Sequence, residues 1–337
     1  MRSTLGFSLS CRRARAAIAA LMVMVAGLGM SACSSGEAAN GQANSGHKQL
    51  ILGFMAFACS SSTFSDDLCD GFQNGAKSLP GGWDFQLKTG IDFSDTNAYN
   101  ALIRNGLQLK PAGIVVLPTG PVAQLTVLQE ACDKGVKVVV IDQPIPDLKC
   151  ASSFVAADNR KLGEELGEWL VNHPTGSKKV GIITMPPGQF VMNDDRVAGF
   201  KAAIERAGYD IVATSTTTGT LDDARNVATN LLTAHPEVGV IMASFEGLAM
   251  GALKAVGDKD IAIVTVDGSV DFVKNIATGH VSADVAQDPY GMTGTAIRTV
   301  HSAAAGQKVD PRIVPDSRIV DAANVEHYIA RGGMRGK

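Results

Sequence analysis

Short, continuous apolar runs alternate with longer amphipathic stretches along most of this chain. Between the runs, stretches such as 160–173 and 224–235 carry apolar residues at the 3.6-residue spacing of a helix. The apolar runs are bounded by turn residues and occupy 50–57, 113–118, 137–142, 179–185, 238–244 and 261–267. A strand that is apolar throughout is typical of a parallel sheet covered on both faces. The pattern therefore predicts β-α-β units and parallel sheets.

The alternation is interrupted near residues 151–159, where turn residues replace any helical period, and it restarts at residue 178. We therefore predict an α/β fold of two similar doubly wound parallel-sheet lobes. Each lobe contains one apolar strand that ends in an aspartate, Asp142 or Asp267. Ligands of open α/β sheets bind beyond the carboxyl ends of the strands. We therefore expect these two carboxylates on opposite sides of one cleft.

The N-terminal residues have a different pattern. Four arginines precede an apolar segment that ends in small residues, which describes a secretory signal peptide, with an uncleaved anchoring helix as the alternative. Met-Ser-Ala-Cys at 30–33 resembles a bacterial lipobox. We predict a lipoprotein signal peptide at 1–32, acylation of Cys33, and a flexible Gly/Ser/Ala/Asn-rich tether at 33–47.

Length and charge narrow the function classes. The 337 residues are enough for two domains, and the net charge of −3 gives no indication of a nucleic-acid partner. Four cysteines remain outside the predicted signal peptide and lipidation site: Cys59, Cys69, Cys132 and Cys150. An extracytoplasmic location permits disulfides, and four cysteines allow three pairings. Our hypothesis is the local pairing, Cys59–Cys69 and Cys132–Cys150; four free thiols are the alternative.

The sequence lacks the motifs of several nucleotide- and metal-binding sites. The sequence has no phosphate-binding loop, no G-x-G-x-x-G after the first strand and no zinc-binding spacing, so we expect no cofactor and no metal. Ser62 or Thr63 can cap the helix after the first apolar run, with Asp66 and Asp67 in its first turn. We expect these acids to join Asp142 and Asp267 around the cleft. Such a cleft would repel an anion but accept hydrogen bonds from the hydroxyls of a neutral ligand.

Arg196 is the candidate donor in the same cleft. It follows the apolar run at 179–185 and lies early in a predicted helix. The alternative is a surface arginine paired with Asp194 or Asp195.

Several segments in order resemble the ribose- and galactose-type periplasmic substrate-binding proteins, the sugar-binding components of ABC importers. The resemblance extends from about residue 48 to 325 and is strongest at 230–256, 266–269 and 283–296, with further matches at 138–143, 155–159 and 194–200. It implies two lobes joined by three crossings, a three-strand hinge. It places the N-terminal lobe at 48–156 plus 289–313 and the C-terminal lobe at 157–288 plus 314–330.

The resemblance also implies roles for individual residues. Asp142 matches an aspartate that binds sugar hydroxyls, and Arg196 matches an arginine that donates to sugar oxygens. Asp267 matches the aspartate of the second lobe, and Gln287 matches a glutamine at a lobe crossing. Phe64 lies where an aromatic ring packs on the sugar face. Ser62 lies where ribose-type members have asparagine.

This sequence departs from the ribose-type pattern at four positions. Leu117 and Phe245 replace asparagines, Gln143 replaces an arginine and Val266 replaces an aromatic residue. A site built for hydroxyls rejects ligands that leave its polar groups unpaired. We therefore expect a less polar pocket that keeps the aspartate–arginine core. A short polyol or a relative of a pentose or tetrose fits better than ribose, with a glucose-sized ligand as the alternative.

We predict an extracytoplasmic solute-binding lipoprotein, not an enzyme, anchored to the outer face of the cell membrane. Its expected partners are a small neutral sugar or sugar alcohol and ABC importer permease subunits, with no nucleic acid, and we expect a monomer. LacI-type repressors share the two-lobe domain, but a signal peptide replaces their DNA-binding segment here. A glycosidase-like carboxylate pair has no further support. The remaining alternatives are a protein that binds a nucleoside or furanose-type signal, with Phe64 and Phe245 around a base, and a receptor without transport.

Overall fold

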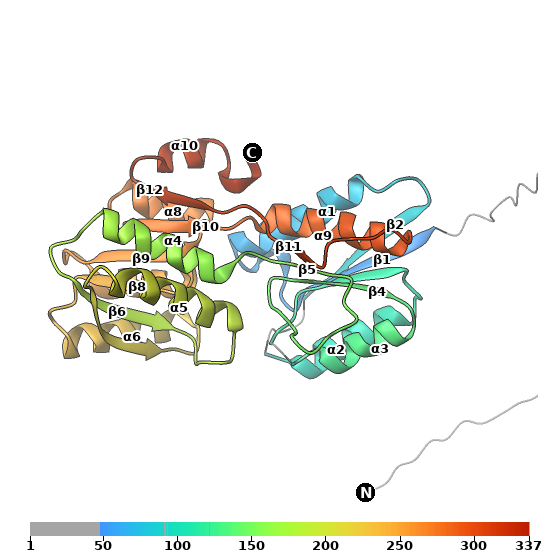
Figure 1. Cartoon of the computed structure of the whole chain (residues 1–337), viewed down its shortest axis with the longest axis horizontal. Coiled ribbons are helices and arrows are strands. Elements are labelled where there is room, and N and C mark those ends of the chain that lie inside the picture. Colours follow the sequence, from blue (N-terminus) through green and yellow to red (C-terminus); the bar gives the residue numbers. More distant parts are fainter. Residues whose placement is uncertain (1–47, 91, 93, 121, 337) are drawn as a thin grey trace, which may run out of the picture. The chain divides into compact units, whose positions relative to one another are not determined.

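The computed structural model describes residues 48–336 except 91, 93 and 121. The predicted signal peptide, tether and Cys33 lie outside the described residues. The described chain forms two six-stranded sheets, with strand orders β11-β5-β4-β3-β1-β2 and β12-β10-β9-β8-β6-β7. Figure 1 shows both sheets with helices on each face. The predicted fold class, two doubly wound α/β lobes, is confirmed.

The first sheet is parallel throughout. Its strands are β1 (Gln49–Phe54), β2 (Trp83–Lys88), β3 (Gly113–Val116), β4 (Lys137–Ile141), β5 (Ser153–Val155) and β11 (Arg312–Ile313). Its helices are α1 (Thr63–Lys77), α2 (Thr96–Leu107), α3 (Leu125–Asp133) and α9 (Pro289–Ala304), with a 3-10 turn η1 (Cys59–Ser61) before α1.

Alternate residues of these strands face opposite layers of helices. Ile51 and Val139 pack with α1 and α9, whereas Leu52 and Val138 pack with α2 and α3. Because both layers are apolar, the central strands β1, β3 and β4 are apolar at nearly every position, whereas the edge strand β2 carries Asp84, Gln86 and Lys88. Figure 1 shows the two helical layers on either side of the sheet.

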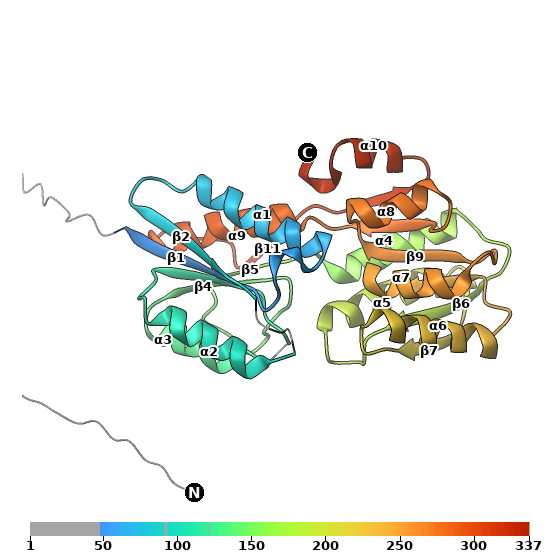
Figure 2. The ribbon, with the colours of Figure 1, turned by 180° about the vertical axis from the view of Figure 1, so that it is seen from behind.

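The second sheet repeats this plan with one antiparallel edge strand, β12. Its strands are β6 (Lys179–Thr184), β7 (Asp210–Thr216), β8 (Val240–Ala243), β9 (Ala262–Asp267), β10 (Ala283–Ala286) and β12 (Arg318–Asp321). One face is covered by α4 (Asn159–Asn172) and α5 (Val191–Glu205). The other is covered by α6 (Leu221–Ala234), α7 (Glu246–Val256), α8 (Val270–Ala277) and α10 (Val325–Ala330), followed by the 3-10 turn η2 (Gly333–Gly336). The view from behind in Figure 2 brings this second layer forward.

The chain passes between the two sheets three times. It leaves the first sheet after β5, returns from β10 to α9, and crosses again between β11 and β12. The first five strands of each half have the same spatial order, 2-1-3-4-5 in the numbering of that half. The two halves therefore place equivalent strand ends at equivalent positions. Asp142 follows β4, and Asp267 ends β9, the fourth strand of each half.

Candidate functional site

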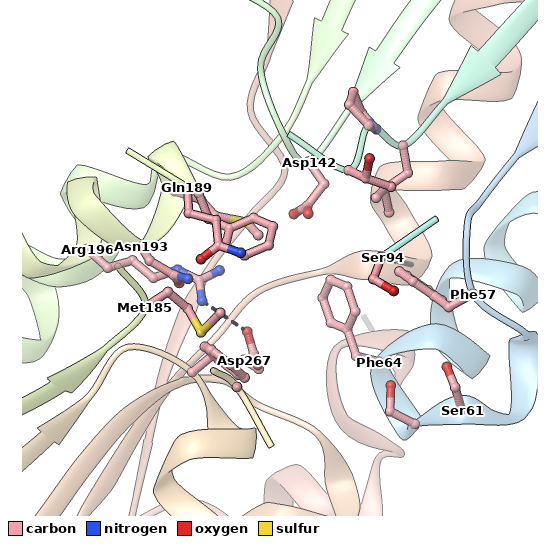
Figure 3. A pocket seen from close by; sticks show the side chains of 18 of the residues that line it. Phe57, Ser61, Phe64, Ser94, Asp142, Met185, Gln189, Asn193, Arg196 and Asp267 are labelled. Atoms are coloured by element: carbon pink, nitrogen blue, oxygen red, sulfur yellow. Dashed lines mark hydrogen bonds and ion pairs between the residues drawn. The ribbon is translucent and has the colours of Figure 1, made fainter. Parts of the chain in front are cut away.

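A cavity of about 660 Å³ is lined by residues from both lobes. Seven of the eight predicted ligand-binding residues line it: Ser62, Phe64, Asp142, Arg196, Phe245, Asp267 and Gln287. These residues follow strand ends or begin the next helix, where the topology of doubly wound sheets places ligand sites. Figure 3 shows Arg196 and Asp267 on one side of this pocket and Phe64 and Ser61 on the other, with Asp142 between them in the view.

Asp142 is the carboxylate that the first lobe contributes. It stands directly after β4 with φ of 62°, in a backbone region that aspartate adopts more readily than most residues. The side chain is buried, and no described residue donates a hydrogen bond to its carboxylate. Burial raises the pKa of Asp142 to about 6; the positive charge of Arg196 opposes this shift and the negative charge of Asp267 adds to it. The described residues therefore leave this carboxylate without a hydrogen-bond donor.

Asp267 is the corresponding carboxylate of the second lobe, and it is held by three donors. Its Oδ1 accepts from Arg196 Nη1 at 3.3 Å and from Gln287 Nε2 at 2.7 Å. Its Oδ2 accepts from the backbone N–H of Glu246 at 3.3 Å, at the start of α7. Burial raises the pKa of Asp267, and these donors, with Arg196 foremost, oppose the rise. The orientation of this side chain is thus fixed before a ligand binds.

Arg196 is a buried residue of the second lobe and not a surface arginine. Its Nε donates to Asn159 Oδ1 at 2.9 Å, and its Nη1 donates to the carbonyl of Ser244 at 2.9 Å as well as to Asp267. The alternative pairing with Asp194 is not observed, because Asp194 accepts from the backbone N–H of Gly188. The guanidinium is therefore oriented by three acceptors.

Two glycines allow this arginine to approach the neighbouring helix. A Cβ on Gly163 of α4 would lie 2.0 Å from the carbonyl oxygen of Arg196, and one on Gly199 of α5 would lie 2.0 Å from that of Arg160. Real Cβ atoms do not approach so closely. Glycine at both positions lets α4 and α5 pack backbone to backbone. We infer that this close packing determines the position of Arg196 relative to Asp267.

The first helix is capped as predicted but does not bring its acids to the pocket. Ser62 accepts from the backbone N–H of Ser65 at 3.1 Å and forms a capping box with it. Neither Asp66 nor Asp67 lines the cavity. Asp67 is instead paired with Arg335 near the C-terminus. The expectation that these acids repel anions from the cleft was therefore wrong; Asp142 and Asp267 are the carboxylates that line it.

The predicted contact of Gln143 with the ligand is not observed in the pocket. Gln143 is 1% exposed but does not line the cavity, and neither its Nε2 nor its Oε1 has a partner among the described residues. The chain turns at Asp142, where φ is positive, and of these two neighbours only Asp142 lines the pocket. Leu117 does line the pocket, which makes this wall apolar.

Sequence reasoning missed 13 of the 21 residues that line the cavity. The additional residues are Phe57, Ser61, Ser94, Thr96, Pro118, Thr119, Met185, Gln189, Phe190, Met192, Asn193, Thr218 and Gly219. All lie in segments that follow β1, β2, β3, β6 or β7. The ends of β1, β3 and β6 were visible as the ends of apolar runs, whereas β2 and β7 are not among those runs. The sequence pattern did not show which loop residues turn inward.

Two disulfides are present in the first lobe. Cys59 is joined to Cys69 and Cys132 to Cys150, which is the local pairing. The Cys59–Cys69 disulfide joins η1 to α1. The pocket residue Ser61 is the last residue of η1, and the pocket residue Ser62 follows it.

Neither a membrane-spanning helix nor a metal site is found in the part of the chain that the structure describes. Within residues 48–336, apart from the three gaps, no helix is long and apolar enough to cross a bilayer. In the same residues no cluster of three or more His, Cys, Asp or Glu side chains is arranged to hold a metal ion.

Comparison with known proteins finds a family match over most of the chain. Residues 52–308 match a family profile described as a periplasmic binding protein domain. The chain is 26% identical over 210 residues to the ribose import binding protein of Escherichia coli (strain K12), covering 61% of this chain and 70% of that protein. It is 26% identical over 305 residues to the D-allose-binding periplasmic protein of the same organism, covering 81% and 94%.

Solved structures show the same fold. An ABC transporter solute-binding protein from Mycobacterium smegmatis with bound glycerol superimposes with a TM-score of 0.75 at 25% identity, covering 84% of this chain and 97% of that one. One from Agrobacterium vitis with bound α-D-tagatopyranose gives 0.77 at 19% identity, covering 85% and 99%.

Proposed function

Because the chain belongs to the periplasmic binding protein domain family, we propose that it captures a small neutral sugar or sugar alcohol outside the cytoplasm and delivers it to an ABC importer. It is a binding protein and not an enzyme, in line with relatives that are named as binding proteins for ribose and D-allose.

The observation that carries the proposal is the constellation of Asp142, Arg196 and Asp267 in one cavity. Carboxylates accept from hydroxyls, and a guanidinium donates to ring or hydroxyl oxygens, in charge-assisted bonds that each contribute about 1.5–3 kcal/mol. Two carboxylates and one guanidinium leave no excess positive charge for an anion. The apolar wall that includes Phe64 and Leu117 suits the C–H face of a small polyol.

The binding cycle follows from the two-lobe plan. The ligand binds one lobe first, and the other lobe then closes over it and excludes water, which strengthens the polar contacts. Closure is favoured only by contacts that the ligand makes in the closed form and not in the open one. In this proposal the permease recognises the closed surface, and acylated Cys33 with the tether at 33–47 holds a monomeric body at the membrane. The hinge separates lobes at 48–156 plus 289–313 and 157–288 plus 314–330.

A second candidate is binding of a nucleoside or a furanose-type signal. Phe64 of the first lobe and Phe245 of the second both line the pocket, as do Phe57 and Phe190. Aromatic side chains are suited to stacking on a planar base. The same captured state could serve a membrane receptor in place of a transporter.

Thermal unfolding against a ligand panel separates these functions. The protein without residues 1–33, purified free of ligand, is heated with D-ribose, D-allose, D-arabinose, ribitol, erythritol, glycerol, adenosine and uridine in turn. At about 100 times its dissociation constant, a ligand adds roughly 2.7 kcal/mol to the free energy of unfolding. For a body of this size the midpoint rises by at least a few degrees. A response confined to nucleosides supports the second candidate, and no response in any class overturns both.

A further inference from the structure

Asn193 is a buried amide of the second lobe whose side chain makes no hydrogen bond within the described residues. It is 2% exposed, and its Oδ1 has no partner. Asn159, on the adjacent helix, shows the usual arrangement, because its Oδ1 accepts from Arg196 at 2.9 Å. Buried polar groups of folded proteins are nearly always paired, so an unpaired one calls for an explanation.

The position of Asn193 supplies that explanation. It lines the cavity and lies three residues before Arg196 on α5, which places both side chains on one face of the helix. Figure 3 shows the two side by side, across the pocket from Phe64 and Ser61. Among described residues with an unpaired buried side-chain oxygen or nitrogen, Asn193 and Gln287 are the ones that line this cavity. The remaining such side chains do not line it.

The cavity-lining side-chain oxygens that lack partners share one chemical character. Asn193 Oδ1 and Gln287 Oε1 are acceptors, and the Asp142 carboxylate is an acceptor without a donor among the described residues. Arg196 is the neighbouring positive charge, but its Nε and Nη1 already serve acceptors of the protein. These three groups are therefore suited to ligand groups that donate hydrogen bonds.

We propose that Asn193 is a ligand-binding residue that accepts a hydrogen bond from a ligand hydroxyl beside the one that Arg196 contacts. This inference rests on the proposed function and deepens it, because it selects ligands that donate from several neighbouring hydroxyls. Carboxylate and phosphate derivatives of the same sugars, whose anionic groups only accept, are rejected by the same three acceptors.

The test compares ligand binding by wild type, by Asn193→Leu and by Asn193→Ala, which has a smaller side chain. The ligands are the sugars and sugar alcohols of the panel together with ribose 5-phosphate and ribonate. Asn230→Ala is the matched control, because Asn230 is an exposed asparagine on α6 of the same lobe. Dissociation constants are measured by calorimetry for every compound that stabilises wild type, and the midpoint of unfolding is measured for each ligand-free variant.

We expect both Asn193 variants to bind about tenfold more weakly, the value for one lost hydrogen bond. The ligand-free midpoint of Asn193→Leu should equal or exceed that of wild type, since an unpaired amide is removed, and Asn230→Ala should match wild type in both measurements. The two anions should not bind wild type.

Three results overturn the inference while the proposed function stands. They are affinities of the Asn193 variants within twofold of wild type, a ligand-free midpoint of Asn193→Leu that falls together with affinity, which would mark a structural role, and binding of either anion as tight as that of the sugar or sugar alcohol that wild type binds best. If no sugar or sugar alcohol stabilises wild type, the proposed function itself fails and the inference falls with it.

Discussion

Asp142 and Asp267 occupy equivalent positions in the two lobes, yet their surroundings differ. The site around Asp142 is here called the first corner, and the site around Asp267 the second corner. Asp142 directly follows the fourth strand of its half and Asp267 ends the fourth strand of the other, and both have positive φ, 62° and 150°. Asp267 accepts three hydrogen bonds from its own lobe, whereas the carboxylate of Asp142 receives none from the described residues. The same position in the fold is thus pre-organised in one lobe and unpaired in the other. We infer that the second lobe fixes the orientation of the ligand and that Asp142 gains its donors from the ligand.

The difference extends behind the two corners. Glu246 accepts from the backbone N–H of Ser269 at 2.6 Å, next to Asp267. Burial raises the pKa of Glu246, and the charges of Asp284 and Asp267 raise it further. Burial also raises the pKa of Asp284 to about 7. Asp267 therefore belongs to a network of coupled carboxyl groups. Burial raises the pKa of Asp142, the positive charge of Arg196 opposes this rise, and the negative charge of Asp267 adds to it. Arg196 and Asp267 both belong to the opposite lobe.

The largest expected effect is that of Arg196→Ala, because it disrupts the pre-organised corner. Removing one partner of a buried ion pair leaves a buried charge uncompensated, which destabilises proteins by about 3–5 kcal/mol. Asn159 and the carbonyl of Ser244 also lose their donor. We expect a lower free energy of unfolding in urea together with loss of measurable ligand binding. Unchanged stability would show that the second corner does not depend on the arginine.

Asp142→Asn should separate binding from stability. The substitution removes a charge that no described residue pairs, so the ligand-free protein should be as stable as wild type or more stable. Two charge-assisted bonds to ligand hydroxyls would be weakened, and we expect affinity for a stabilising sugar to fall about 100-fold. Asp147→Asn, at an exposed position five residues away, is the control. A large loss of stability in Asp142→Asn would contradict the contrast between the corners.

Gly163→Ala tests whether helix packing sets the second corner. The added Cβ would meet the carbonyl oxygen of Arg196 at 2.0 Å, so α4 and α5 must separate. Overpacking of this kind costs about 1–3 kcal/mol, and affinity should fall because Arg196 moves relative to Asp267. Gly294→Ala in α9 is the matched helical control, since its Cβ would meet the nearest atom at an ordinary 3.5 Å. Equal behaviour of the two variants would rule out packing as the cause.

The fold was predictable because each apolar run is covered by helices on both faces and so lacks polar positions. The corners were predictable for a similar reason, since an aspartate at the end of a buried strand needs a partner or a ligand. The contrast between them was not predictable. The donors to Asp267 come from residues 71, 21 and 20 positions away in sequence. Gln143 faces away, and Asn193 faces inward, because of local backbone directions that a one-dimensional pattern does not record.

The smallest expected effect is a pH dependence that belongs to the first corner. The ordinary pKa of the Asp142 carboxyl is 3.8, and in the folded protein burial raises it to about 6. Between these values the folded state binds more protons than the unfolded state, so this residue's contribution to the free energy of unfolding decreases as pH rises from about 4 to about 6. Ligand hydroxyls donate to the ionised form, and bound ligand therefore competes with the proton.

Affinity for a stabilising sugar should consequently be constant above pH 6.5 and weaken by up to about tenfold per pH unit below 6. Calorimetry between pH 5 and 8 measures this directly. Asp142→Asn should bind weakly but without the change near pH 6, because its amide does not titrate. A change near pH 7 that persists in Asp142→Asn would instead assign the proton to Asp284, whose pKa is raised to about 7 behind the other corner. In that case the pre-organised lobe, and not the unpaired carboxylate, would control how binding responds to acid.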